Sequence, residues 1–225
     1  MNVSNKFNHI KAIFFDTGDT LYTNEEMEKA YPKKLRDLVV ETRGISKEEA
    51  KQLIDETAAK LKGTVKHVTK VRTMAELGFT RPQVHEAFCK VNPKEFLSPD
   101  PELDLLMANL SKKYKLGIIS NFKRSHILEI LEALGLSSDW FPLLVTEDIV
   151  QEIKPDHEPF LKAIEISGFL PTECLYVGDS PTKDMLPAKE VGMMTVLIAQ
   201  NSAQEDTENA DAVIGDVKEI TSILF

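Results

Sequence analysis

The chain has 225 residues, of which 42% are hydrophobic and 28% charged, and its formal net charge at pH 7 is −9. This acidic balance argues against nucleic acid or an anionic membrane surface as the main partner, and no apolar run approaches the ~20 residues of a membrane span. Because the start of the chain lacks an apolar signal core and Cys89 and Cys174 form no metal-binding or disulfide spacing, we expect a reduced, cytoplasmic protein.

An apolar run near the start of the chain ends in an acidic turn. Residues 11–16 read KAIFFD and predict a buried strand, and Gly18 among small polar residues predicts a tight turn after it. In an open α/β sheet the site lies just past the carboxyl ends of the strands. Asp16 is therefore a candidate nucleophile, metal ligand or both; the alternative is an ordinary turn residue.

Residues 24–96 are predicted to be wholly helical. Ser46 and Glu49 fit a capping box, and Gly44 stands where the preceding helix should end. Gly63 and residues 78–82 mark further breaks. The region therefore predicts a compact helical bundle of about four elements.

The remainder of the chain alternates strands with helices. We predict strands at 115–120, 142–146, 173–178 and 193–198, helices at 123–135, 156–168 and 182–192, an edge strand at 211–214 and a last helix at 216–223. This alternation predicts an α/β fold with a doubly wound parallel sheet, to which strand 11–16 must belong. We therefore expect a core domain of residues 1–21 and 98–225, and an inserted helical-bundle cap of residues 22–97 that acts as a lid.

Polar residues follow four of the predicted strands, three times at the strand end and once in the segment after the third strand. They are Asp16, then Ser120 and Asn121, then Lys154, and finally Asp179 with Asp184. Because the carboxyl ends of parallel strands face one crevice, we expect these side chains to lie together. The three aspartates would suit Mg²⁺, and Ser120 with the backbone N–H groups of residues 120–122 could hold anionic oxygens. Lys154 could then offset negative charge while Asp16 attacks phosphorus.

Each of these residues also has a purely structural explanation. Ser120 could cap the helix from 123, and Lys154 could be a solvated loop lysine. Asp179 could be a turn residue, and Asp184 could lie in the first turn of a helix and interact favourably with the helix dipole. Four such residues at successive strand ends are unlikely to coincide by chance, so their combination favours a site.

These motifs resemble those of the haloacid dehalogenase-like (HAD) hydrolase superfamily over nearly the whole chain. The matching segments are residues 14–21 (FFDTGDTL), 117–121 (GIISN), 154–155 (KP) and 178–184 (GDSPTKD). The resemblance implies a Rossmann-like core with a helical cap inserted after the first motif. Residues 20–22 are in addition weakly similar to the pyrimidine 5′-nucleotidase group.

The resemblance also implies a Mg²⁺-dependent phosphatase of a small phosphorylated metabolite, acting through a phospho-aspartate intermediate. The implied roles are nucleophile and metal ligand for Asp16, phosphate binding for Ser120 and Asn121, pairing with Asp16 and the phosphate for Lys154, metal binding for Asp179, and support of the metal or of Lys154 for Asp184. Neither the substrate nor the oligomeric state follows from the sequence.

Gly18 departs from the family pattern. The family's phosphatases usually carry an aspartate here that protonates the leaving oxygen and later activates water, a role worth ~10²–10⁴-fold in rate. The Gly18 carbonyl can still bind Mg²⁺, and Asp19 could replace the missing acid only if the turn re-aims it. Two alternatives therefore stay open: a protein that binds or senses a phosphoryl ligand with weak turnover, and a dehalogenase or phosphonatase-type hydrolase, whose relatives also lack this acid.

Overall fold

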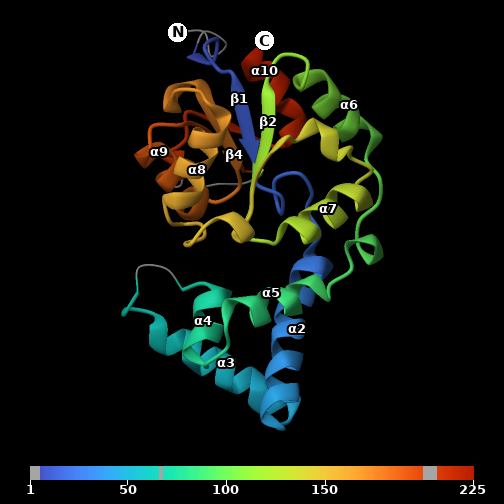
Figure 1. The fold of residues 1–225 in the computed structure, drawn as a ribbon, viewed down its shortest axis with the longest axis vertical. Coiled ribbons are helices and arrows are strands. Elements are labelled where there is room, and N and C mark those ends of the chain that lie inside the picture. The colour runs from blue at the N-terminus through green and yellow to red at the C-terminus, as the bar shows by residue number, and fades with distance from the viewer. Residues whose placement is uncertain (1–5, 66–67, 200–206) are drawn as a thin grey trace. The chain divides into compact units, whose positions relative to one another are not determined.

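The computed structural model describes residues 6–65, 68–199 and 207–225. The chain divides into two compact units (Figure 1). One comprises Met1–Thr23 with Leu97–Phe225, and the other comprises Asn24–Phe96. The strands of the sheet belong to the first unit, and the second unit is helical.

The first unit is built on a six-stranded sheet with the order β3-β2-β1-β4-β5-β6, in which every neighbouring pair is parallel. The strands are β1 (Ala12–Phe15), β2 (Lys115–Ile119), β3 (Leu143–Val145), β4 (Cys174–Gly178), β5 (Met194–Ile198) and β6 (Ala212–Ile214). The predicted α/β fold with a parallel sheet is thereby confirmed. Strands β2 and β3 lie on one side of β1, and β4, β5 and β6 lie on the other. The end of β1 therefore lies between the ends of β2 and β4, where ligands of such sheets bind.

Helices lie on both sides of the strands (Figure 1): α8 and α9 on one side, and α6, α7 and α10 on the other. Their bounds are α6 (Pro101–Leu110), α7 (Arg124–Ala133), α8 (Glu158–Ser167), α9 (Leu186–Glu190) and α10 (Thr221–Leu224). The predicted helix 182–192 is instead a π-helical turn, Pro181–Met185, that runs into α9. Helix α6, which Asp100 caps through the Leu103 N–H, is not among the predicted elements.

The central strands are buried on both faces. All four residues of β1 are fully buried, and Phe14 packs in a core cluster that includes Phe160 and Tyr176. Gly117 of β2 makes room for this packing, since a Cβ there would lie 2.5 Å from the Phe14 ring and from the Leu143 carbonyl oxygen. The close packing fixes the strand whose end carries Asp16.

The second unit consists of α2 (Glu25–Arg43), α3 (Lys47–Leu61), α4 (Lys70–Glu76), α5 (Arg81–Cys89) and a 3₁₀ turn at Pro93–Glu95. The predicted helical character of this region is confirmed. Ser46 and Glu49 form the expected capping box at the start of α3, and Gly44 ends α2 in a left-handed conformation with φ 67°. The core of the unit includes an edge-to-face contact between Tyr31 and Phe88.

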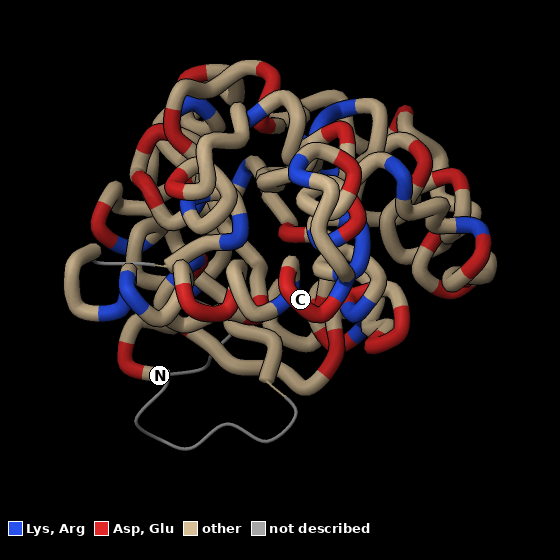
Figure 2. Tube along the Cα trace, turned by 90° about the horizontal axis from the view of Figure 1, so that it is seen from below, with Lys and Arg blue, Asp and Glu red and all other residues tan. Residues whose placement is uncertain are grey.

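Charged residues are spread along the chain. Figure 2 shows Lys and Arg positions interspersed with Asp and Glu positions along the trace. Some of these charges hold distant segments together: Lys6 and Lys189 both pair with Asp211, at 2.8 and 2.6 Å. Within the described residues, the helices are all too short or too polar to cross a membrane.

Candidate active site

Asp16 stands at the exit of β1, where the chain leaves the sheet. Its backbone N–H still donates to the Val177 carbonyl at 2.9 Å, and the next carbonyl, that of Thr17, accepts from the Leu21 N–H at 2.8 Å. The turn between them places Asp19 in the left-handed region, with φ 52°, a conformation that aspartate tolerates better than most residues. The strand end and the tight turn together fix the direction in which Asp16 leaves the sheet.

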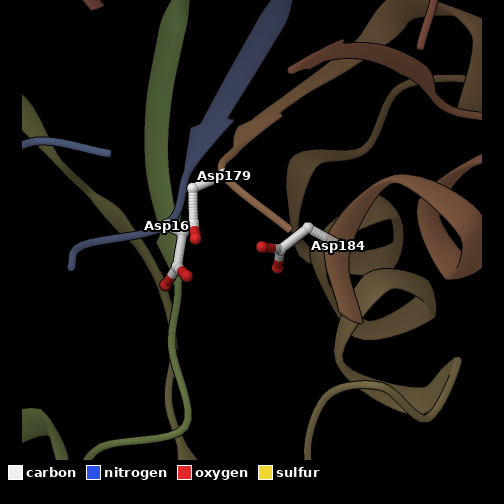
Figure 3. A group of neighbouring side chains, drawn as sticks. All are labelled: Asp16, Asp179 and Asp184. Carbon is white, nitrogen blue, oxygen red and sulfur yellow. The ribbon is translucent and has the colours of Figure 1, made fainter. Parts of the chain in front are cut away.

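Three aspartates converge at this edge of the sheet (Figure 3). Asp16 follows β1, Asp179 follows β4, and Asp184 belongs to the π-helical turn. One carboxylate oxygen from each lies within 4.8 Å of the others. The structure thus brings together the three acids that the sequence placed after two separate strands.

Lys154 inserts its ammonium group among these acids. Its Nζ lies 2.9 Å from Asp16 Oδ1, 2.9 Å from Asp184 Oδ1 and 2.8 Å from the Tyr176 hydroxyl. A lysine ammonium has three N–H donors, so these three acceptors match its full capacity. Since the side chain is only 4% exposed, Lys154 is not a solvated loop lysine.

Asp184 is the most deeply buried of the three acids, with 1% of its side chain exposed. Its Oδ1 accepts from Lys154 and, at 2.9 Å, from the Tyr176 hydroxyl, and its Oδ2 accepts from the Ser180 N–H at 3.2 Å. Both carboxylate oxygens are therefore already hydrogen-bonded within the protein. This arrangement indicates that Asp184 orients Lys154, and an interaction with a helix dipole alone would not explain it.

Tyr176 is a member of the site that the sequence did not reveal. It lies in the middle of the apolar run of β4, where a tyrosine is expected to fill the core. Its ring does pack edge-on against Phe160, with centroids 5.0 Å apart, but its hydroxyl accepts from Lys154 and donates to Asp184. Burial and the neighbouring Asp184 and Asp16 charges raise its pKa well above the ordinary value, so the hydroxyl keeps its proton.

Ser120 lies at the end of β2, facing the same edge. It is buried, and its hydroxyl lies 3.4 Å from the Thr17 hydroxyl and 3.4 Å from the Phe122 N–H. Helix α7 begins at Arg124 with Lys123 as its N-cap, so Ser120 does not cap this helix. Thr17, the immediate neighbour of Asp16, is a second hydroxyl that sequence reasoning left out.

The Asn121 side chain is turned toward the loop that carries Lys154. Its Nδ2 donates to the Lys154 carbonyl, and its Oδ1 accepts from the Lys154 N–H, both at 2.9 Å. The predicted phosphate contact of Asn121 therefore would have to come from its backbone N–H.

The cluster carries more negative than positive charge. Burial, together with nearby Asp184, raises the pKa of Asp16 to about 6 despite the lowering effect of Lys154. Burial and the charges of Asp184 and Asp16 raise the pKa of Asp179 to about 7. Burial alone would lower the pKa of Lys154, but the two carboxylates beside it outweigh burial and raise it. Three carboxylates around one ammonium have an excess of negative charge that a bound cation would neutralise, and an all-oxygen donor set is the one that Mg²⁺ prefers.

Gly18 is half-buried in the turn and forms a short β-bridge with Tyr22. The next residue, Asp19, is exposed, and its charge contributes to the raised pKa of Asp179. Gly18 brings no side chain to the site, so the position that usually supplies a proton offers only its backbone.

Comparison with known proteins agrees with these motifs. Residues 10–198 match the family model described as haloacid dehalogenase-like hydrolase. The chain is 27% identical to a glyceraldehyde 3-phosphate phosphatase of Methanothermobacter thermautotrophicus, covering 96% of this chain and 100% of the relative. It is 31% identical to the protein of the same name from Methanocaldococcus jannaschii, covering 96% and 97%. The crystal structure of a HAD phosphatase from Thermococcus onnurineus is similar with a TM-score of 0.71, at 29% identity and over 96% and 98% of the two chains.

Proposed function

The chain belongs to the haloacid dehalogenase-like hydrolase family, and we propose that it is a Mg²⁺-dependent phosphatase that acts on a small phosphorylated metabolite through a phospho-Asp16 intermediate. The predicted family and the predicted hydrolase class are both confirmed by the match. The observation that carries the proposal is the 2.9 Å contact between Lys154 Nζ and Asp16 Oδ1 inside a cluster of three carboxylates.

Asp16 is the proposed nucleophile. One carboxylate oxygen attacks phosphorus in line, the bond from phosphorus to the ester oxygen breaks, and the leaving alcohol takes a proton from solvent because Gly18 offers none. Water then attacks the acyl-phosphate, which releases inorganic phosphate and restores Asp16. Lys154 neutralises part of the charge on the nucleophile and on the phosphoryl oxygens as they meet.

The phosphoryl oxygens need donors as well as charge. In the proposal, the Ser120 hydroxyl and the Asn121 backbone N–H bind them at the end of β2, next to the end of β1. The buried Thr17 hydroxyl, 3.4 Å from Ser120 Oγ, helps to orient the serine. These groups hold the phosphoryl group still while Asp16 attacks.

The residues proposed to hold Mg²⁺ are Asp16, Asp179 and the carbonyl of Gly18, with Asp184 beside them. The ion would supply a positive charge that shields the attacking carboxylate from the phosphoryl oxygens. Support comes from the excess of carboxylates and from the raised pKa values of Asp16 and Asp179. Because both oxygens of Asp184 already accept hydrogen bonds, we assign it mainly to the orientation of Lys154.

The cap predicted for residues 22–97, which corresponds to the helical unit Asn24–Phe96, is proposed to select the substrate. The small-metabolite class is supported by relatives named glyceraldehyde 3-phosphate phosphatase that match over nearly all of this chain. The test is release of inorganic phosphate with MgCl₂ from a panel that includes glyceraldehyde 3-phosphate and a pyrimidine 5′-nucleotide. Turnover that disappears in Asp16→Asn and on chelation of the metal is expected. An unchanged Asp16→Asn variant would exclude the mechanism.

A second candidate is a protein that binds a phosphorylated ligand but turns it over slowly. Gly18 is the observation that favours it, since loss of a general acid costs ~10²–10⁴-fold. Calorimetry would show tight binding of a panel member with negligible phosphate release. Rapid turnover of any panel member would exclude this candidate.

A further inference from the structure

Lys154 is held at both ends. At the tip of the side chain, the ammonium contacts Asp16, Asp184 and Tyr176. At the backbone, the Asn121 carboxamide forms two hydrogen bonds of 2.9 Å, one to the Lys154 carbonyl and one from its N–H. Asn121 follows β2 whereas Lys154 lies in the loop after β3, so the amide joins two parts of the chain distant in sequence.

The backbone contact matters because a lysine side chain is long and flexible. Its four-carbon stem has many rotamers, and a shift of its backbone moves the ammonium relative to the carboxylates. Asn121 fixes the backbone from which the side chain starts, with one hydrogen bond from its Nδ2 and one to its Oδ1. The carboxamide has a second N–H, so an effect through Lys154 and a direct phosphoryl contact have to be separated by experiment.

We propose that Asn121 is a positioning residue whose carboxamide sets the place of Lys154, and that its side chain contributes to phosphoryl binding only through that lysine. The proposal rests on the proposed function, in which Lys154 contacts the phosphoryl group and Asp16. It differs from a direct phosphate contact by Asn121 in a measurable way, because an effect exerted through Lys154 must vanish when the lysine is gone.

The test is a double-mutant cycle on binding of inorganic phosphate, measured by calorimetry with MgCl₂ present. Asn121→Ala is expected to weaken binding about tenfold, within the range for coupled residues of one network. In a Lys154→Met background the same change is expected to cost less than about twofold. Equal losses in the two backgrounds would overturn the proposal in favour of a direct contact.

The loop provides a matched control. Glu158 accepts from the N–H groups of Gln151 and Glu152, both at 2.7 Å, so it holds the same loop at another point, through other residues. Glu158→Ala is expected to leave phosphate binding within about twofold of the unchanged protein. If Glu158→Ala weakens binding as much as Asn121→Ala, the effect is a general loosening of the loop and the proposal fails.

A second readout does not depend on catalysis or on the folding of Lys154→Met. In a protein labelled with ¹⁵N-lysine, the buried Lys154 ammonium should give a slowly exchanging NMR signal that is absent from Lys154→Met or, if that variant does not fold, from Lys154→Arg. Asn121→Ala is expected to shift or broaden this signal, and Glu158→Ala is not. An unchanged signal in Asn121→Ala would refute the positioning role, whether or not the protein binds phosphate. Failure to bind phosphate would instead count against the proposed function.

Steady-state kinetics add a third distinction. A lysine displaced from Asp16 should lower kcat as well as raise KM, since its charge acts both on the bound phosphoryl group and where the nucleophile meets phosphorus. Asn121→Asp keeps the acceptor for the Lys154 N–H but turns a carboxylate oxygen toward the Lys154 carbonyl and adds negative charge near the phosphoryl site, so we expect a loss of kcat at least as large as that of Asn121→Ala. A rise in KM alone would contradict the proposal.

Discussion

Gly178, the last residue of β4, leaves the space that Asp184 occupies. A Cβ at Gly178 would lie 2.9 Å from the Cβ, Cγ and Oδ2 of Asp184, a separation at which atoms must move apart. The buried carboxylate that orients Lys154 therefore depends on the absence of a side chain six residues earlier in the chain.

Gly178→Ala is expected to displace Asp184 and with it the ammonium of Lys154. We expect a loss of about 10²-fold in kcat/KM, which a misplacement of about 1 Å can cause, and a decrease of about 1–3 kcal/mol in the free energy of unfolding from overpacking. Phosphate release and urea denaturation measure the two effects. Gly215→Ala is the control, since its Cβ would meet only the flexible Glu219 carboxylate, at 3.3 Å. Full activity in Gly178→Ala would show that the Asp184 position is not critical.

Tyr176→Phe removes one hydroxyl and keeps the ring that packs on Phe160. The change leaves a buried donor of Lys154 and a buried acceptor of Asp184 each without one partner, so the free energy of unfolding should fall by about 1–3 kcal/mol. We also expect a lower kcat, because Lys154 loses one of the three acceptors that fix its ammonium. Thermal and urea unfolding, with kinetics on the best substrate of the panel, provide the measurements.

Tyr114→Phe is the matched control for this variant. Tyr114 is also buried but lies against Phe225, away from the acidic cluster. Loss of the Tyr114 hydroxyl should leave kcat unchanged and should change the free energy of unfolding by less than about 0.5 kcal/mol. Equal effects of the two substitutions would mean that the Tyr176 hydroxyl has no special part in the site.

The sequence predicted the place of the acids because parallel topology alone brings strand ends together. Asp16, Asp179 and Lys154 each follow an apolar run, and any right-handed parallel arrangement of those runs places them at one edge. The α/β fold was predictable for the same reason: strands of buried residues alternate with helices of matching length.

Side-chain partners were less predictable, because they depend on distances that no local pattern fixes. Tyr176 reads as a core residue, and only the position of Lys154 reveals its second role. Asn121 could equally have faced a phosphoryl group or the Lys154 backbone, and the choice depends on a loop 33 residues away. Local irregularity was missed as well: the predicted helix from 182 begins as a π-helical turn, which places Asp184 inside the site.

Metal binding should depend on pH through Asp16 and Asp179. The pKa of Asp16 is raised from 3.8 to about 6 and that of Asp179 from 3.8 to about 7. At a pH between 3.8 and these raised values, the folded chain therefore binds more protons than the unfolded one. Without metal, the contribution of these two groups to stability should therefore increase as the pH falls from about 7 toward about 4. Mg²⁺ needs the charged carboxylates, so it should raise Tm most near pH 8 and least near pH 5.

Thermal unfolding with MgCl₂ or EDTA across this pH range measures both trends. In a variant with Asp16→Asn and Asp179→Asn, the metal-dependent rise in Tm should be lost at every pH, because neither amide can supply a carboxylate. A rise in Tm of equal size at low and high pH in the unchanged protein would show that Mg²⁺ does not bind through these two groups.

Gly18→Asp should restore the missing general acid. Gly18 is not among the glycines with positive φ in the described part of the chain, so an aspartate there meets no left-handed backbone strain. If protonation of the leaving oxygen limits the rate, kcat should increase by ~10²-fold or more. Gly18→Asn is the matched control, because its side chain has the same shape and carries no transferable proton. A gain in Gly18→Asp alone would assign the slow step to proton transfer. Equal rates in the two variants would show that this protein protonates its leaving group by a route that does not pass through this position.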